Sequence, residues 1–190
     1  IHIIDAELMG KGEKEKKDLY IEGIQNNGII NHYEYIINSE GTIEIRHVLK
    51  PEGKMPLWFP RIGLTLTVSD ALDQVKWYGR GPQENYPDRK TGYPMGIYAS
   101  TVQAMYEPYL MPQDYGLRTD VRWLQLTTDK GIGLQFKMNE WFNFNIYPYS
   151  TDNLTKAMYT YQLQKQKGMT LNLDYATTGV GCTARGVFGA

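Results

Sequence analysis

Residues 79–89 read GRGPQENYPDR, and this stretch decides how the rest of the chain is interpreted. It follows the alternating run VKWY at residues 75–78, which is typical of a strand, and it holds two glycines, two prolines and two carboxylates. Glycine reaches backbone conformations that other residues avoid, whereas proline restricts φ and removes an N–H donor. We therefore predict a tightly built loop at the end of a strand, the signature loop.

The side chains of the signature loop are expected to be structural. Glu84 and Asp88 should accept hydrogen bonds from backbone amides or from the loop's own arginines, and Trp77 should lie at least partly buried beside the loop. The same two carboxylates are the candidate glycosidase pair, because a retaining glycosidase needs two carboxyl groups about 5–5.5 Å apart. The residues assigned to the structural signature are Trp77, Gly79, Gly81, Pro82, Glu84, Asn85, Tyr86, Asp88 and Arg89.

Apolar and polar residues alternate with a period of two along most of the chain, which is the pattern of half-buried strands. One short helix is expected over residues 152–158, capped by Ser150 or Thr151, and residues 86–111 are expected to form a long ordered loop. The pattern predicts an all-β protein, a large antiparallel β-sandwich that forms a single domain over residues 1–190. Strands are expected at residues 1–9, 19–24, 29–37, 42–49, 57–68, 73–79, 121–128, 132–138, 141–147 and 169–175.

Composition excludes several classes of partner. The net charge is −1, from 20 basic and 21 acidic residues, so nothing attracts the chain to nucleic acid or to an anionic membrane. No apolar run approaches the roughly 20 residues that a membrane-spanning helix needs. The single cysteine, Cys182, excludes an internal disulfide framework, and the compartment stays open between cytoplasm and periplasm.

Other motifs accompany the signature loop in a fixed order: FPRIG at 59–63, YEPY at 106–109, YGLR at 115–118 and GVG at 179–181. Together they resemble the C-terminal domain of the β-galactosidases of glycoside hydrolase family 2. The resemblance covers about residues 59–181, and the first fifty residues more weakly. It implies the β-supersandwich shared with galactose mutarotases, of which this chain would be an incomplete, latter part cut from a longer polypeptide.

The resemblance also implies where the chemistry lies. The family's catalytic glutamates belong to a barrel domain that this chain lacks, so Glu84 and Asp88 are not expected to be catalytic. The chain would pack on that barrel in a homo-oligomeric enzyme that hydrolyses terminal non-reducing β-D-galactosides. No cofactor or metal is expected in this chain, while the full enzyme would use Mg²⁺ or Na⁺.

The resemblance points to one substrate-binding segment. In the family, the loop after the Gly-x-Gly motif carries a tryptophan that stacks on the sugar in the barrel's active site. Arg185 or Gly186 takes that place here, so these two residues are expected to line the rim of the sugar pocket. A guanidinium hydrogen-bonds hydroxyl groups through its planar fork. The alternative is a structural glycine turn with an exposed Arg185.

Two other functions stay open. A free carbohydrate-binding β-sandwich would use an exposed aromatic face around Trp58, Trp123 or Trp141. A mutarotase-like epimerase would need a glutamate base and a histidine acid that converge on the sugar. The only histidines are His2, His32 and His47, all in the first quarter of the chain, which weighs against the epimerase. The spacing of Asp114, Asp120 and Asp152 does not match a calcium loop.

Overall fold

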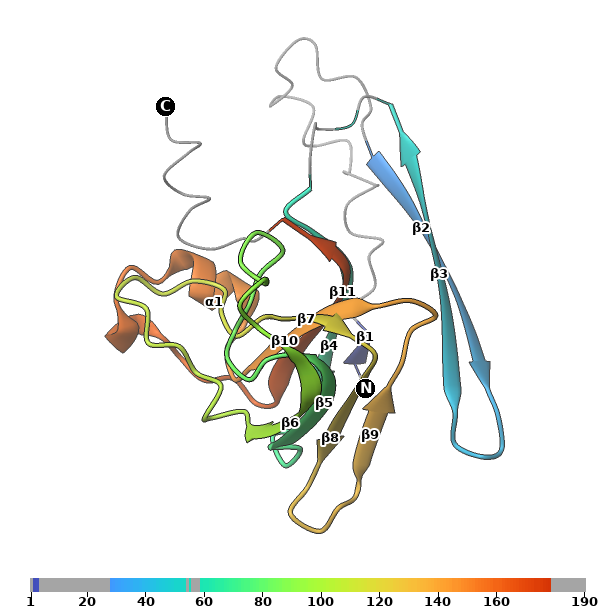
Figure 1. The fold of residues 1–190 in the computed structure, drawn as a ribbon. Coiled ribbons are helices and arrows are strands. Elements are labelled where there is room, and N and C mark those ends of the chain that lie inside the picture. Colours follow the sequence, from blue (N-terminus) through green and yellow to red (C-terminus); the bar gives the residue numbers. More distant parts are fainter. Residues whose placement is uncertain (1, 4–27, 54, 56–58, 179–190) are drawn as a thin grey trace. The chain divides into compact units, whose positions relative to one another are not determined.

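A computed structural model of the chain describes residues 2–3, 28–53, 55 and 59–178 (Figure 1). The chain folds as two compact units, one of Ile4–Trp58 and the other of Ile1–Ile3 with Phe59–Ala190. Whether residues 1–190 behave as a single domain stays a prediction. No helix within the described ranges is both long enough and apolar enough to cross a membrane.

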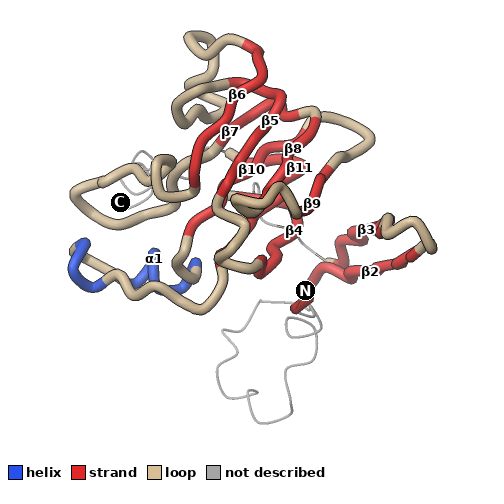
Figure 2. Tube along the Cα trace, turned by 90° about the horizontal axis from the view of Figure 1, so that it is seen from below, coloured by secondary structure: helices blue, strands red, loops and turns tan. Residues whose placement is uncertain are grey.

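The larger unit contains two antiparallel sheets, which confirms the all-β prediction; strands are red in Figure 2. The five-stranded sheet has the order β1-β4-β11-β10-β7 and the four-stranded sheet the order β6-β5-β8-β9. The strands of the first are β1 His2–Ile3, β4 Arg61–Val68, β11 Met169–Thr177, β10 Phe142–Tyr147 and β7 Arg118–Val121. Those of the second are β6 Met95–Thr101, β5 Gln74–Arg80, β8 Trp123–Thr127 and β9 Gly133–Phe136.

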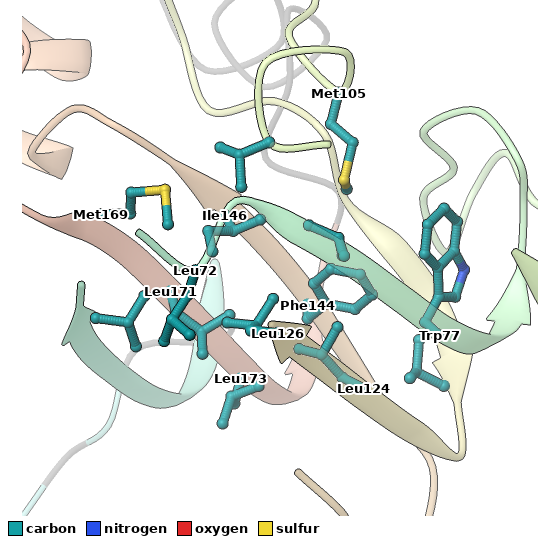
Figure 3. Packing of buried hydrophobic residues seen from close by; sticks show 14 of the residues in the cluster. Leu72, Trp77, Met105, Leu124, Leu126, Phe144, Ile146, Met169, Leu171 and Leu173 are labelled. Atoms are coloured by element: carbon teal, nitrogen blue, oxygen red, sulfur yellow. The ribbon is translucent and has the colours of Figure 1, made fainter. Parts of the chain in front are cut away.

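One hydrophobic core lies between the two sheets (Figure 3). Alternate residues of β10 and β11 supply one side, among them Phe144 and Leu171, and alternate residues of β5 and β8 supply the other. Trp77 of β5 is fully buried, and its ring meets Phe144 edge-on at 5.9 Å. The predicted period of two corresponds to the burial in β5 and β8, whereas β10 and β11 are buried on both faces over most of their length.

Strand β6 corrects the expected loop at residues 86–111. Its alternation is inverted, because Gly96, Tyr98 and Ser100 point inward while Ile97 is 62% exposed. The apolar pattern therefore does not indicate a strand with a buried apolar face. Backbone pairing with β5 holds β6 instead, in an unbroken register from Gln74 opposite Thr101 to Arg80 opposite Met95.

The strand expected at residues 121–128 corresponds to β8, and the residues before it form β7, which belongs to the other sheet. Asp120 in β7 has a φ of 55°. β7 ends at Val121 and β8 begins at Trp123, so Arg122 alone joins the two strands. The amide of Arg122 at the junction donates to the carbonyl of Tyr78, at 2.7 Å. The apolar pattern did not predict β7, because all four of its residues are buried although Arg118, Thr119 and Asp120 are polar.

Helix α1 (Thr151–Lys156) confirms the expected helix and its cap. The Ser150 hydroxyl accepts from the amide of Asn153 at 3.1 Å. The helix ends earlier than predicted, since Ala157 is extended, and a 3₁₀ turn follows at Thr160–Gln162. Strand β4 begins directly after Pro60, as expected of a residue that cannot donate to a sheet.

The smaller unit is described as a hairpin of β2 (Gly28–Ile37) and β3 (Ile43–Glu52). Its turn, residues 38–41, lies between the strands expected at residues 29–37 and 42–49. The side chain of Asn38 accepts from the amides of Glu40 and Thr42 at 3.1 and 3.0 Å. Most of the segment expected as strands at residues 1–9 and 19–24 lies outside the described residues.

Candidate functional site

Glu84 is the centre of the signature loop. Its side chain is buried, with 5% exposed, and each carboxylate oxygen has two donors. Oε1 accepts from Arg89 Nη2 at 3.0 Å and from the Tyr109 hydroxyl, and Oε2 accepts from the Gly116 amide at 2.9 Å and the Tyr86 hydroxyl at 3.2 Å. Burial, together with the charge of Glu84, raises the pKa of both tyrosines, so they stay protonated as donors.

Asn85 joins the loop to β7. The fully buried side chain accepts from the amide and the hydroxyl of Thr119, at 3.0 and 2.5 Å, and donates to the Gln83 carbonyl at 3.0 Å. Its own amide donates to the carbonyl of Leu117 at 2.8 Å. The side-chain oxygen, the side-chain amide and the backbone amide of Asn85 thus all form hydrogen bonds inside the protein.

Two glycines allow the loop to pack closely on the sheets. A Cβ on Gly79 would lie 2.8 Å from Cγ2 of Val121, and one on Gly81 would lie 2.8 Å from the ring of Tyr98 and 3.0 Å from that of Trp77. The Trp77 indole N–H donates to the Arg80 carbonyl at 3.0 Å. A larger residue at position 81 would displace two packed aromatic rings.

Two further residues of the signature lie at the surface. Pro82, which follows a cis peptide bond, and Asp88 are both exposed. Asp88 makes no hydrogen bond or ion pair to any described residue, contrary to the expectation that it would hold the loop. Of the two loop arginines expected as partners of the carboxylates, Arg89 binds Glu84, whereas Arg80 binds Asp120, with 2.6 Å between Nε and Oδ2.

Asp120 is the point at which the loop meets the sheet. Besides Arg80 it accepts from Lys90 Nζ at 2.9 Å, and its amide donates to Oδ1 of Asn143 at 3.3 Å. Burial works to raise the pKa of Asp120, but the hydrogen bonds from the two cations outweigh it and leave the pKa below its usual value. Asp120 is therefore a fixed carboxylate.

A groove of about 670 Å³ lies beside Asp120. Its walls come from the end of the signature loop, from β7, from the turn before β10 and from the last residues of β11. β11 is irregular there, because its pairing with β4 shifts register between Asp174 and Ala176. The side chains that give the groove its chemistry are those of Lys90, Asp120, Asn139, Glu140, Trp141 and Asn143.

A second polar cluster is buried on the outer face of the five-stranded sheet. Arg61 lies 3.4 Å from Asp114 and its Nε lies 3.0 Å from Asp174 Oδ2. Asn145 and Tyr147 donate to Asp114 at 2.9 and 3.1 Å. Burial raises the pKa of Asp174 to about 7 against the opposing effect of Arg61. Asp174 has only 1% of its side chain exposed, so the cluster offers no open site.

The chain is similar in sequence to a known family and to several known proteins. The family described as "Beta galactosidase small chain" matches residues 7–187. The chain belongs to the β-galactosidase small-chain family. Similar proteins named beta-galactosidase come from Priestia megaterium, 38% identical over 147 residues, and from Vibrio cholerae, 39% identical over 122 residues. A third, from Pseudoalteromonas haloplanktis, is 33% identical over 159 residues.

These alignments cover 77%, 64% and 82% of this chain, respectively. They cover only 14%, 11% and 14% of the relatives. The small-chain sequence therefore spans about a seventh or less of the length of the curated relatives that it matches. In these relatives the matched region is therefore one part of a much longer sequence.

Several predicted site residues of this small-chain domain lie outside the described residues. These are Arg185 and Gly186, the expected pocket rim, and Trp58, one of three aromatic candidates. Of the other two candidates, Trp123 is half-buried in β8 and Trp141 is 56% exposed at the groove. His47 stacks on Tyr33, with 4.3 Å between ring centroids.

The resemblance implies Mg²⁺ or Na⁺ in a full enzyme, and the described residues contain no cluster of three His, Cys, Asp or Glu ligands for such an ion. Asp114 and Asp174 come closest, but both face the guanidinium of Arg61, which would repel a second cation.

Sequence reasoning missed the groove. Its polar residues come from the turn at residues 139–141, from one outward position of β10 and from β7, and none belongs to a motif. The signals present in the sequence were Trp141, singled out as an aromatic candidate, and Asn143, which alternation places on the face away from the core. The distance between these segments and Lys90 along the chain conceals their contact.

Proposed function

We propose that this chain is the non-catalytic small-chain domain of a β-galactosidase. The complete enzyme would hydrolyse terminal non-reducing β-D-galactosides by double displacement, as a homo-oligomer, with both catalytic carboxylates in a barrel domain. This domain would pack on the barrel and complete the rim of its sugar pocket with Arg185 or Gly186. Family membership over residues 7–187 supports the assignment.

The state of Glu84 carries the non-catalytic part of the proposal. A retaining glycosidase needs a carboxylate that can attack the sugar and a second one that exchanges a proton with the leaving group. Glu84 is buried with four donors around it, so no lone pair is directed to a substrate. Asp88 is exposed without an orienting partner among the described residues, and neither side chain lines the groove beside Asp120.

The ions of the full enzyme are assigned to other domains. Mg²⁺ or Na⁺ would supply electrostatic stabilisation there, and the described residues of this chain offer no fitting set of ligands. No step of the proposed reaction is therefore attributed to an ion bound here.

The test is to express the complete polypeptide from the flanking coding sequence, a truncation that lacks these 190 residues, and the 190-residue chain alone. Hydrolysis of a chromogenic β-D-galactoside is expected from the complete polypeptide and not from the chain alone. Steady turnover by the purified chain that disappears in Glu84→Gln would overturn the non-catalytic role. A complete polypeptide that cleaves other glycosides and not β-galactosides would overturn the assigned reaction.

The pocket-rim role has its own test in the complete enzyme. Arg185→Ala should raise KM more than it lowers kcat, because a contact to the bound sugar is lost while the hydrolytic groups stay in place. An unchanged KM would contradict a rim role for Arg185 and leave this domain an architectural part.

A further inference from the structure

The groove beside Asp120 has an aromatic wall that the fold holds in an exposed position. Trp141 is 56% exposed, although an indole is among the most favourable side chains to bury. The guanidinium of Arg122 lies over the ring at 3.9 Å from its centroid. Arg122 is not among the residues that line the groove. The cation–π contact orients Trp141 without closing the groove.

The opposite side of the groove offers hydrogen-bonding groups of both kinds. Asn143 uses Oδ1 to accept from the Asp120 amide, and its Nδ2 has no hydrogen-bond partner among the described residues. The Lys90 ammonium carries three protons, and among the described residues its hydrogen bonds go to the Asp120 carboxylate, at 2.9 and 3.2 Å. Asn139 and Glu140 are exposed, and neither bonds to a described residue. Donors and acceptors therefore face the same space.

The charges of the groove favour a neutral ligand. Lys90 is paired with Asp120, and Glu140 adds one negative charge at the rim. An anion would meet two carboxylates, and a purely apolar molecule would leave the amide and ammonium groups without water or partners. A pyranose satisfies both requirements, because its C–H face packs on an aromatic ring while its hydroxyls both donate and accept.

Two side chains of the groove, Asp120 and Lys90, are paired before a ligand arrives. Asp120 is held at a φ of 55° by two cations, and Lys90 follows directly after the signature loop. Little conformational entropy remains to be lost when a ligand binds these two side chains.

From these observations we propose that the groove is a binding site for a neutral pyranose unit. The sugar packs its C–H face on Trp141, and Asn143, Lys90 and Asn139 bond its hydroxyls. The site does not depend on the proposed β-galactosidase function, since the groove is built from this chain alone.

The experiment titrates the purified 190-residue chain with methyl β-D-galactopyranoside and methyl β-D-glucopyranoside, followed by calorimetry and by indole NMR signals. Saturable binding with a dissociation constant in the millimolar range is expected, with a shift of the Trp141 indole signal. Trp141→Ala should weaken binding about tenfold or more, which is the scale of one lost aromatic contact. Trp123→Ala is the matched control, because this second indole does not line the groove. The affinity of the Trp123→Ala variant for both sugars should stay unchanged.

Asn139→Ala and Glu140→Ala supply a second set that keeps the fold, because both side chains are exposed. A loss of affinity in Asn139→Ala with an unchanged circular dichroism spectrum would support the site even if Trp141→Ala did not fold. Failure of both sugars to bind, or equal effects of Trp141→Ala and Trp123→Ala, would overturn the proposal. The β-galactosidase proposal would survive that result, because it is tested by turnover of the complete polypeptide.

Discussion

The signature loop and the rim of the groove contain the same kinds of residue in opposite states. Glu84 of the loop is buried with four donors, whereas Glu140 of the rim is exposed and bonds to no described residue. Trp77 is fully buried, whereas Trp141 is more than half exposed. The loop, which has the distinctive motif, uses its polar groups to hold the fold. The rim, which has no motif, leaves its polar groups available for a ligand.

The largest expected effect tests whether Glu84 is an anchor. Glu84→Gln should lower the free energy of unfolding by about 3–5 kcal/mol, because an amide N–H₂ would face two donors and the charge that binds Arg89 would be lost. Urea denaturation measures the change. Glu140→Gln is the control and should stay within about 0.5 kcal/mol of the parent chain. Equal effects of the two substitutions would contradict the contrast between loop and rim.

Asp174 provides a pH test of a buried carboxylate with fewer donors than Glu84. Its pKa is about 7 in the folded chain against 3.8 when unperturbed, so the folded state binds this proton more tightly than the unfolded state. The stabilisation from this bound proton is complete below about pH 4 and is lost as the pH rises through about 7, and it amounts to about 4 kcal/mol in total. The stability of Asp174→Asn relative to the parent chain should therefore increase over this pH range.

Denaturant midpoints of the two proteins between those pH values measure the difference. Subtracting one profile from the other removes the contributions of all other groups, including Asp120, whose lowered pKa acts in the opposite direction. Parallel profiles would show that Asp174 is ionised throughout and paired with Arg61.

A smaller effect is expected from packing beneath the loop. Gly81→Ala should cost about 1–3 kcal/mol, because the new methyl group would overlap the rings of Tyr98 and Trp77. Gly92→Ala is the matched control, since nothing lies within 4 Å of a Cβ there and its φ is not positive. The midpoint of thermal or urea unfolding measures both. A neutral Gly81→Ala would mean that the aromatic pair can move aside at no cost.

The smallest effect separates the two carboxylates of the loop. Asp88→Asn should change the free energy of unfolding by less than about 0.5 kcal/mol, because Asp88 is exposed and holds no described residue. Urea denaturation alongside Glu84→Gln provides the comparison. A large loss in Asp88→Asn would mean that Asp88 binds a residue outside the described ranges.

Much of the fold follows from the sequence alone, for a local reason. In β5 and β8 the side chains that alternate as apolar are the buried ones, so a period of two reports burial directly. In β10 and β11 the alternating apolar side chains also fill the core, but the polar side chains between them are buried as well. The β2–β3 turn and the Ser150 cap were also predictable, because their hydrogen bonds join residues at most four positions apart. The motif at residues 79–89 likewise indicated a structural loop, and the order of motifs indicated the family.

The remaining features were decided by tertiary structure. Strand β6 forms because the edge of β5 offers backbone hydrogen-bond partners. The side-chain pattern of β6 does not predict a strand, because its apolar residue Ile97 is exposed. The change of sheet after β7 depends on Asp120 at a positive φ, which is held by Arg80 and Lys90 from forty and thirty residues away. The groove joins residues 90, 120 and 139–143 in the same manner. Local patterns indicate which side chains of a strand pack in the core. The contacts between side chains that are distant in the sequence are determined only when the sheets pack together.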